Sequence, residues 1–331
     1  MRIDRNLEVI PKFGEGIEEG FDVHGGDDTG MLRFGNTRSM QLRLSSADRG
    51  NTDKLYNLPV DANVWVVSHG WNDDDSNFSQ IADDIKAQHP EDTVLLLNWS
   101  EGSNNGDPFD GGNCRASTWI KSTAQGVFDK ITSVYKIKDY SKVKLVGHSL
   151  GSLMSTEISK RFGGKTSLLV ALDPPSELSC FGKYEIDKGG EKRSDFAGNS
   201  QMSRSFVGRH SLAGNQDLAK TADKSFWMEF DSVSTNSKEH AWVVQTWEKM
   251  NRSDFLRSSY LSASDFDIHS GWQRNNDISG VYGDWGGRGW EGHSGVIEVG
   301  NPWKNGEKIQ DGSVEWLWVK EDGQTKQIKK I

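Results

Sequence analysis

The sequence has only two cysteines, Cys114 and Cys180, and therefore cannot depend on a framework of disulfide bonds. Neither has the spacing of a zinc motif, and the pair is either one bridge or two free thiols. No apolar run reaches the length of a transmembrane helix, and residues 1–6 lack the apolar stretch of a secretory signal behind them. We therefore expect a cytoplasmic protein, or one exported by a signal-free route.

Positive charge is also scarce, with 39 basic against 48 acidic side chains and a net charge of −9. Because phosphate neutralisation needs clustered cations, we expect no nucleic-acid partner. Apolar residues make up only 34% of the chain, whereas 36 glycines and 13 tryptophans indicate many turns with large aromatic anchors. The composition predicts a soluble protein rich in loops.

The chain divides into three parts by its composition and its pattern of apolar residues. Residues 1–60 contain short alternating pieces that predict edge strands of the main domain. Residues 61–255 alternate apolar runs with helical patterns, which is typical of a parallel sheet covered on both faces. Residues 256–331 are rich in Gly, Trp and Asn and end in an alternating strand, which predicts a small β-rich appendage.

Six apolar runs in the middle part predict buried strands, at residues 63–68, 93–98, 143–146, 167–172, 205–207 and 226–230. Helical patterns separate these runs; they begin near residues 76, 117 and 150, and a last helix covers residues 241–250. The sequence therefore predicts one doubly wound, mostly parallel sheet with helices on both faces.

One motif carries the chemistry. Gly-His-Ser-Leu-Gly at residues 147–151 joins a predicted buried strand to a predicted helix. So tight a turn strains the backbone of Ser149, and only small flanking residues avoid collision. Because the helix N-terminus favours developing negative charge there, we predict Ser149 to be a nucleophile. A similar tetrapeptide at residues 292–295 lacks a second glycine at the required offset, two residues after its serine, and has no helical pattern after it, so we predict no role for it.

A nucleophilic serine needs an orienting carboxylate and a base, here in the chain order Ser, acid, His. Asp173 directly follows the predicted strand 167–172 and precedes two prolines that end it, so we predict Asp173 as the acid. Asp187 and Asp195 are weaker rivals because no strand precedes them.

Position selects the base among eight histidines. Four do not follow a late strand and are set aside: His24, His69, His89 and His148. His240 follows the strand 226–230 and a short polar loop, immediately ahead of a helix, which makes it the predicted base. His210, His269 and His293 stay as rival bases.

An oxyanion hole needs two backbone N–H donors. One is the amide of Leu150, the residue after the nucleophile, and we predict the amide of Trp71, in the loop 68–71, as the other. The Trp71 indole either forms a wall of the acyl pocket or packs under its loop. We also expect His148 to contact the substrate.

Across about residues 60–250 the sequence resembles the pancreatic-lipase-type family of α/β-hydrolases. Four segments in the family's order carry the resemblance: Val-Ser-His-Gly-Trp at 67–71, Leu-Asn-Trp-Ser at 97–100, Val-Gly-His-Ser-Leu-Gly at 146–151 and Ala-Leu-Asp-Pro at 171–174. In this family the acid follows the strand after the nucleophile helix, as Asp173 does. Residues 239–242 match the segment with the catalytic histidine, which supports His240, whereas His210 matches a non-catalytic one.

Two departures from the family bear on substrate. Its lipases carry a long disulfide-closed lid before the catalytic histidine, whereas only residues 231–239 stand there in this chain. The resemblance therefore implies an open pocket that accepts dispersed esters or phospholipids. Residues 256–331 are too short for the family's lipid-binding sandwich. Some members bind calcium, and Glu191 and Asp195 fit such a site poorly. We predict no metal and no cofactor, and a calcium site stays open as the alternative.

Together these residues predict a carboxylic ester hydrolase, a lipase or esterase, that cleaves lipid esters through Ser149, Asp173 and His240. Its partner would be a lipid or small ester, with transient contact to a membrane or lipid surface. Two rival functions stay open: a phospholipase A-type effector or toxin acting on membrane lipids, and an inactive binding protein with a hydrolase fold. Transfer of the acyl group to an acceptor other than water would use the same residues.

Overall fold

The structure is a computed structural model that describes residues 9–11, 17–25, 38–46, 62–74, 78–104, 116–117, 119–175, 195–209, 211, 213–230, 236–252, 295–300, 316–321 and 324–329. Before residue 62, after residue 248 and at residues 229 and 236–238, the description covers the backbone alone. Both cysteines, Cys114 and Cys180, lie outside the described residues, so their pairing stays open.

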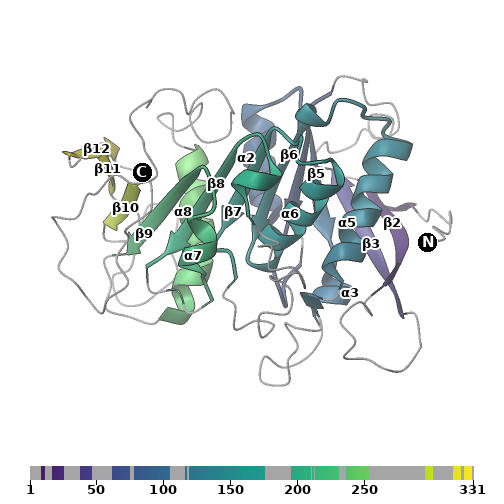
Figure 1. The fold of residues 1–331 in the computed structure, drawn as a ribbon, viewed down its shortest axis with the longest axis horizontal. Helices are drawn as coiled ribbons and strands as arrows, with labels where there is room; N and C mark the ends of the chain where they lie inside the picture. The colour runs from purple at the N-terminus through teal and green to yellow at the C-terminus, as the bar shows by residue number, and fades with distance from the viewer. Residues whose placement is uncertain are drawn as a thin grey trace.

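A twelve-stranded sheet runs through the described part of the chain (Figure 1), in the order β1-β2-β3-β5-β4-β6-β7-β8-β9-β10-β11-β12. Its central strands are all parallel. They are β4 (Val64–Ser68), β5 (Thr93–Asn98), β6 (Val143–His148), β7 (Leu168–Leu172), β8 (Ser203–Gly208) and β9 (Lys224–Phe230). The predicted parallel sheet is confirmed, and the carboxyl ends of these strands meet along one edge.

Further strands extend this sheet on both sides. On one side β1 (Val9–Pro11), β2 (Ile17–Gly25) and β3 (Arg38–Ser46) pair antiparallel in turn, and β3 pairs antiparallel with β5. On the other side β10 (Gly295–Gly300) runs parallel to β9, followed by antiparallel β11 (Trp316–Glu321) and β12 (Gln324–Lys329). Both ends of the chain thus supply strands to the central sheet; the division into three parts stays a prediction.

Alternate residues of each central strand face opposite layers of helices. Val64 and Val66 of β4 pack with α5 (Ile120–Asp129) and α6 (Leu150–Arg161). Trp65 and Val67 pack on the other side with residues of α2 (Ser79–Gln88) and α8 (Asn236–Arg252). Figure 1 shows helices on both faces of the sheet. Parallel strands that are buried on both faces have nearly continuous apolar sequences, as β4, β5 and β7 do.

Several short helices complete the described elements: α3 (Ser100–Ser103), α7 (Gln216–Ala219), the π-helix Lys130–Val134 and the 3-10 helices Tyr140–Lys142 and Ala197–Asn199. No helix in the described residues is long and apolar enough to cross a membrane.

A polar cluster lies near the amino ends of β4 and β6, away from the edge where the strands end. The carboxylate of Asp92 accepts hydrogen bonds from Trp65 Nε1 at 2.8 Å, Asn63 Nδ2 at 2.8 Å and Lys144 Nζ at 3.0 Å. Burial raises the pKa of Asp92, but these bonds and the Lys144 charge outweigh it, so the pKa lies below its ordinary value of 3.8. The cluster fixes the loop before β5 to both strands.

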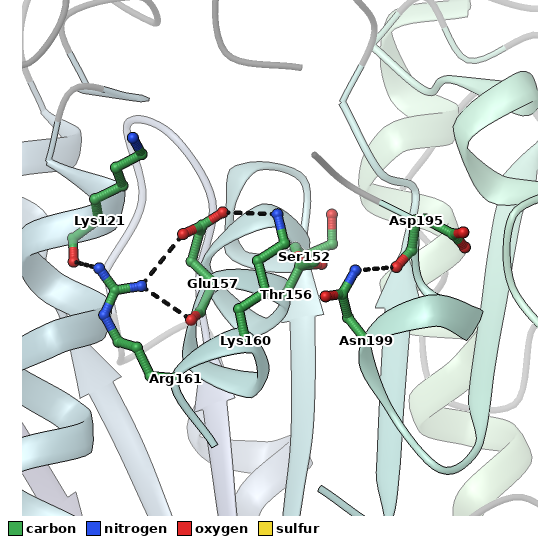
Figure 2. Close-up of polar contacts among 8 residues, drawn as sticks. All are labelled: Lys121, Ser152, Thr156, Glu157, Lys160, Arg161, Asp195 and Asn199. Atoms are coloured by element: carbon green, nitrogen blue, oxygen red, sulfur yellow. Dashed lines mark hydrogen bonds and ion pairs between the residues drawn. The ribbon is translucent and has the colours of Figure 1, made fainter. Parts of the chain in front are cut away.

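The end of α6 is held to α5 by one side chain, shown in Figure 2. Arg161 donates to the Lys121 carbonyl of α5 at 2.6 Å and, within α6, to the carboxylate of Glu157 at 3.2 Å. The same carboxylate accepts from Lys160 at 3.0 Å. This network anchors the helix that begins directly after Ser149, and thereby the turn that holds this serine.

Candidate functional site

Ser149 lies in a sharp turn between β6 and α6. Its backbone has φ 52° and ψ −125°, a conformation that a residue with a side chain rarely adopts. Its amide donates to the Leu172 carbonyl of β7 at 3.0 Å, which ties the turn to the neighbouring strand. Strain of this kind costs about 1–3 kcal/mol and persists where surrounding structure enforces it, commonly at functional sites.

The glycines on either side of Ser149 are required by close backbone contacts. A Cβ atom on Gly147 would collide with the backbone of Gly151, and one on Gly151 would collide with the Ser68 carbonyl of β4. The expectation that only small residues fit around this turn is therefore met at both positions. The nucleophile turn of an α/β-hydrolase has the same construction.

Asp173 ends β7 beside this turn and is fully buried. Its backbone also has a positive φ of 42°, and its amide donates to the Phe206 carbonyl of β8 at 2.7 Å. One carboxylate oxygen, Oδ1, accepts from the Gly208 amide at 2.9 Å. The neighbouring strand therefore sets the orientation of the Asp173 carboxylate.

His240 reaches Asp173 from α8, 67 residues further along the chain. Its Nδ1 lies 2.5 Å from Asp173 Oδ2, and its side chain is 23% exposed. Because a carboxylate only accepts, the proton of a neutral His240 ring sits on Nδ1 and leaves the lone pair on Nε2. The sequence placed His240 ahead of a helix, but it lies inside α8, which begins at Asn236.

The ring of His148 lies beside that of His240, with 4.2 Å between their centroids. The ring of Phe78 also lies beside that of His148, with 5.7 Å between their centroids. Since His148 precedes Ser149, the contact between the two histidines brings His240 to the turn that holds Ser149. Burial lowers the pKa of His148 well below 6.5, and the neighbouring His240 and His69 lower it further. The His240 carbonyl offsets part of this effect, although neither His148 ring nitrogen makes a hydrogen bond of standard geometry within the described residues.

The loop after β4 approaches Ser149 from the other side. A Cβ on Gly70 would lie 2.8 Å from Ser149 Cβ, so only glycine allows this approach. His69 Nε2 accepts from the Trp99 amide at 3.1 Å, and its Nδ1–H donates to the Gly70 carbonyl at 2.9 Å. In a trans peptide the N–H points opposite to the C=O, so His69 fixes the direction of the Trp71 amide.

The remaining predicted residues lie around the same turn. Leu150 is the first residue of α6 and is buried, and the half-buried ring of Trp71 packs against the core on the α5 and α6 side. The Trp71 indole N–H is buried without a hydrogen-bond partner among the described residues. The oxyanion role of the two amides and the substrate contacts of Trp71 and His148 stay predictions.

One rival for the role of the acid, Asp195, lies in a turn before the 3-10 helix Ala197–Asn199. The Asp195 side chain accepts a hydrogen bond from the Gly198 amide at 3.2 Å. His240 makes its hydrogen bond with Asp173 instead. The other candidates lie outside the described residues. They are the rival acid Asp187, the calcium candidate Glu191 and the rival bases His210, His269 and His293. Within the described part of the chain no group of three or more His, Cys, Asp or Glu side chains could hold a metal ion.

Sequence reasoning missed one polar residue of the site, Ser211. Its hydroxyl lies 2.5 Å from Asp173 Oδ2, the same oxygen that accepts the hydrogen bond from His240 Nδ1. The sequence carries no distinctive signal for it: β8 lies next to β7, and polar residues after both strands share one sheet edge, but a lone serine there has no recognisable pattern. The adjacent His210, as a rival base, had the more conspicuous chemistry in the same segment.

No protein-family model matches the sequence, and no curated protein is similar to it. Solved structures are similar in outline. A dienelactone hydrolase from Anabaena variabilis is 11% identical over 74% of this chain and 95% of its own, with a TM-score of 0.37. A cold-adapted esterase from an Arctic intertidal metagenomic library is 12% identical over 75% of this chain and 99% of its own, with a TM-score of 0.42.

The order of the central strands and the Ser149 turn decide the fold. It is the α/β-hydrolase fold. Within this fold, Ser149, Asp173 and Gly70 all lie at the carboxyl edge of the parallel sheet, where ligands bind in open α/β proteins.

Proposed function

We propose that this protein is a serine carboxylic ester hydrolase with Ser149 as nucleophile, His240 as base and Asp173 as acid. The observation that carries the proposal is the 2.5 Å bond between His240 Nδ1 and Asp173 Oδ2 beside a serine held at φ 52°. A base oriented by a buried carboxylate, next to a strained serine turn, is the arrangement that activates a hydroxyl for acyl transfer.

The proposed ester hydrolysis proceeds through proton transfers at His240. His240 Nε2 takes the proton of Ser149 Oγ as this oxygen bonds to the ester carbonyl carbon, and Asp173 stabilises the imidazolium that forms. The amides of Trp71 and Leu150 bind the oxyanion of the tetrahedral intermediate. The carbon–oxygen bond to the alcohol then breaks, and the alcohol oxygen takes the proton from His240. Water repeats these steps on the acyl-enzyme and releases the acid.

We propose lipid esters as the substrate class, with Trp71 and His148 lining the pocket. Support comes from the resemblance to the pancreatic-lipase-type family and from the short connection before the base. Only residues 231–235 separate β9 from α8, and His240 already lies in the second turn of this helix. No long lid fits there, which favours esters that are dispersed in water or presented by a phospholipid bilayer.

Hydrolysis of p-nitrophenyl esters of increasing acyl length tests the proposal. Wild type should turn them over, Ser149→Ala should not, and both should unfold at similar denaturant concentration. Ser294→Ala is a matched control because it removes the serine of the second Gly-His-Ser segment, for which we predict no role. Equal turnover by wild type and Ser149→Ala would contradict the proposal.

A second assay separates the two rival functions. Release of fatty acid from phospholipid vesicles, without activity on emulsified triacylglycerol, would favour a phospholipase A-type effector. A folded wild type that hydrolyses neither lipid nor p-nitrophenyl ester would favour a binding protein.

A further inference from the structure

The carboxylate of Asp173 accepts hydrogen bonds from the end of β8 and from the loop after it, as well as from His240. Oδ1 accepts from the Gly208 amide at 2.9 Å, and Oδ2 lies 2.5 Å from both His240 Nδ1 and Ser211 Oγ. Since Asp173 is fully buried, these donors replace the water that would otherwise solvate the carboxylate.

The direction of the Ser211 bond is fixed by a second contact. Ser211 Oγ accepts a hydrogen bond from the Gly214 amide at 3.1 Å. A hydroxyl has one proton to give, and a carboxylate oxygen only accepts, so the Ser211 proton points at Asp173 Oδ2. Ser211 is therefore a donor to the same oxygen that accepts the hydrogen bond from His240 Nδ1.

The loop and the turn after β7 are joined at further points. The Asn215 amide donates to the Pro174 carbonyl at 2.7 Å, and Gly214 forms an isolated antiparallel bridge with Pro175. A Cβ on Gly214 would lie 2.5 Å from Asp173 Oδ1, so the loop passes as close to the carboxylate as glycine permits. The hydroxyl of Ser211 is thus held in place and not free to turn away.

We propose that Ser211 is a positioning residue for catalysis, which acts through Asp173 and does not touch the substrate. Donors on both oxygens stop the carboxylate from rotating, so that Oδ2 stays aimed at His240 Nδ1. As Ser149 attacks and His240 becomes positively charged, this fixed carboxylate stabilises the charge without reorganising. The inference rests on the proposed function, because it assigns Ser211 a part in the same reaction.

Three variants test the inference on an ester that wild type hydrolyses. Ser211→Ala removes the donor, and Ser211→Thr keeps a hydroxyl. Ser200→Ala is the control, because the buried Ser200 hydroxyl also donates its proton within the protein, but to the carbonyls of Phe196 and Met202, which share it away from the site. Because a hydrogen bond to a charged group is strong and only part of it changes in the transition state, Ser211→Ala should lower kcat about tenfold. KM should stay the same, and Ser211→Thr should retain most of the wild-type kcat.

A spectroscopic readout separates positioning from a general loss of structure. The proton between His240 Nδ1 and Asp173 should give a proton NMR resonance far downfield of the backbone amides. It should move in Ser211→Ala, where Oδ2 loses its second donor, and stay unchanged in Ser200→Ala.

Each contrary outcome has one meaning. If wild type hydrolyses the ester and Ser211→Ala matches its kcat, the inference is overturned and the proposed function stands. A Ser211→Thr variant as slow as Ser211→Ala, or equal losses in Ser211→Ala and Ser200→Ala, would also overturn the role of the hydroxyl. If folded wild type has no hydrolytic activity, the proposed function fails and the inference fails with it.

Discussion

The imidazole of His148 packs against the imidazole of His240, with 4.2 Å between ring centroids and 41° between ring planes. His148 is 7% exposed, and Phe78 lies against it. The contact places a neutral, buried ring beside the residue that must gain a proton during the proposed reaction. A second positive charge in this position would oppose that step.

The low pKa of His148 predicts how stability depends on pH. Below about pH 6.5 the unfolded chain binds a proton at this residue and the folded chain does not, so the free energy of unfolding falls as the pH falls, by up to about 1.4 kcal/mol per pH unit. His148→Phe keeps an aromatic ring and removes the proton site. Urea unfolding between about pH 5 and pH 7 should therefore show a weaker pH dependence in the variant. The same slope in both proteins would contradict the prediction.

The approach of Gly70 to Ser149 predicts a large effect from one methyl group. In Gly70→Ala the new Cβ would lie 2.8 Å from Ser149 Cβ and 3.2 Å from the His148 carbonyl, so the loop must move. Displacing the Trp71 amide should lower kcat about 100-fold, the effect of losing one oxyanion donor.

Gly163→Ala is the control for this variant. Gly163 has φ 68° and no atom near its missing Cβ, so alanine strains the backbone without touching the site. It should cost roughly 1 kcal/mol of stability and leave kcat unchanged. Steady-state kinetics and urea unfolding of both variants check the pair, and a normal kcat in Gly70→Ala would argue against an oxyanion role for this loop.

Asp173→Asn and Asp195→Asn together test which of these two carboxylates is the acid of the triad. In Asp173→Asn the amide cannot accept from His240, Ser211 and Gly208 as the carboxylate does, and it carries no charge to stabilise the imidazolium, so kcat should fall by about four orders of magnitude. Asp195→Asn, the matched change at the rival acid, should leave kcat within about twofold of wild type. If the two variants exchanged these effects in ester hydrolysis, the assignment of the acid would be wrong.

Asp92→Asn should affect stability and not activity. The Asp92 side chain is 8% exposed, and neutralising it leaves Lys144 without its partner, at a cost of about 2–4 kcal/mol. Because the pKa of Asp92 is lowered on folding, its contribution is present above pH 3.8 and is lost as the pH falls below that value. Urea unfolding at neutral and acid pH should show the difference between the proteins narrowing in acid. Unequal kcat values would contradict the separation of this cluster from the site.

Apolar patterning predicted the central sheet because a strand buried on both faces leaves an uninterrupted run. The predicted strand 93–98 coincides with β5, and the predicted strand 63–68 differs from β4 by one residue at its start. Helix ends were less accurate. The sequence predicts a helix that begins near residue 76, but α2 starts at Ser79, with Phe78 as its N-cap and no side-chain capping bond. Burial of Phe78 against the sheet, and not capping, sets that end.

The sequence likewise predicted some residues of the candidate site and not others. Ser149 and Asp173 could be placed because each follows a strand that the sequence marks clearly. Ser211 could not be found by the search for triad residues, because its role depends on the distance between two loops and a lone serine after a strand has no distinctive pattern. The function of His69 was missed for a related reason: it bonds a backbone carbonyl and the Trp99 amide, and backbone partners leave no trace in sequence.

The most direct test of the central claim is the intact mass of the protein after reaction with a fluorophosphonate, which labels an activated serine. Wild type and Ser294→Ala should each gain a single adduct, whereas Ser149→Ala and His240→Ala should gain none. An adduct that persists in folded Ser149→Ala, or no adduct on folded wild type, would contradict the claim that His240 and Asp173 activate Ser149.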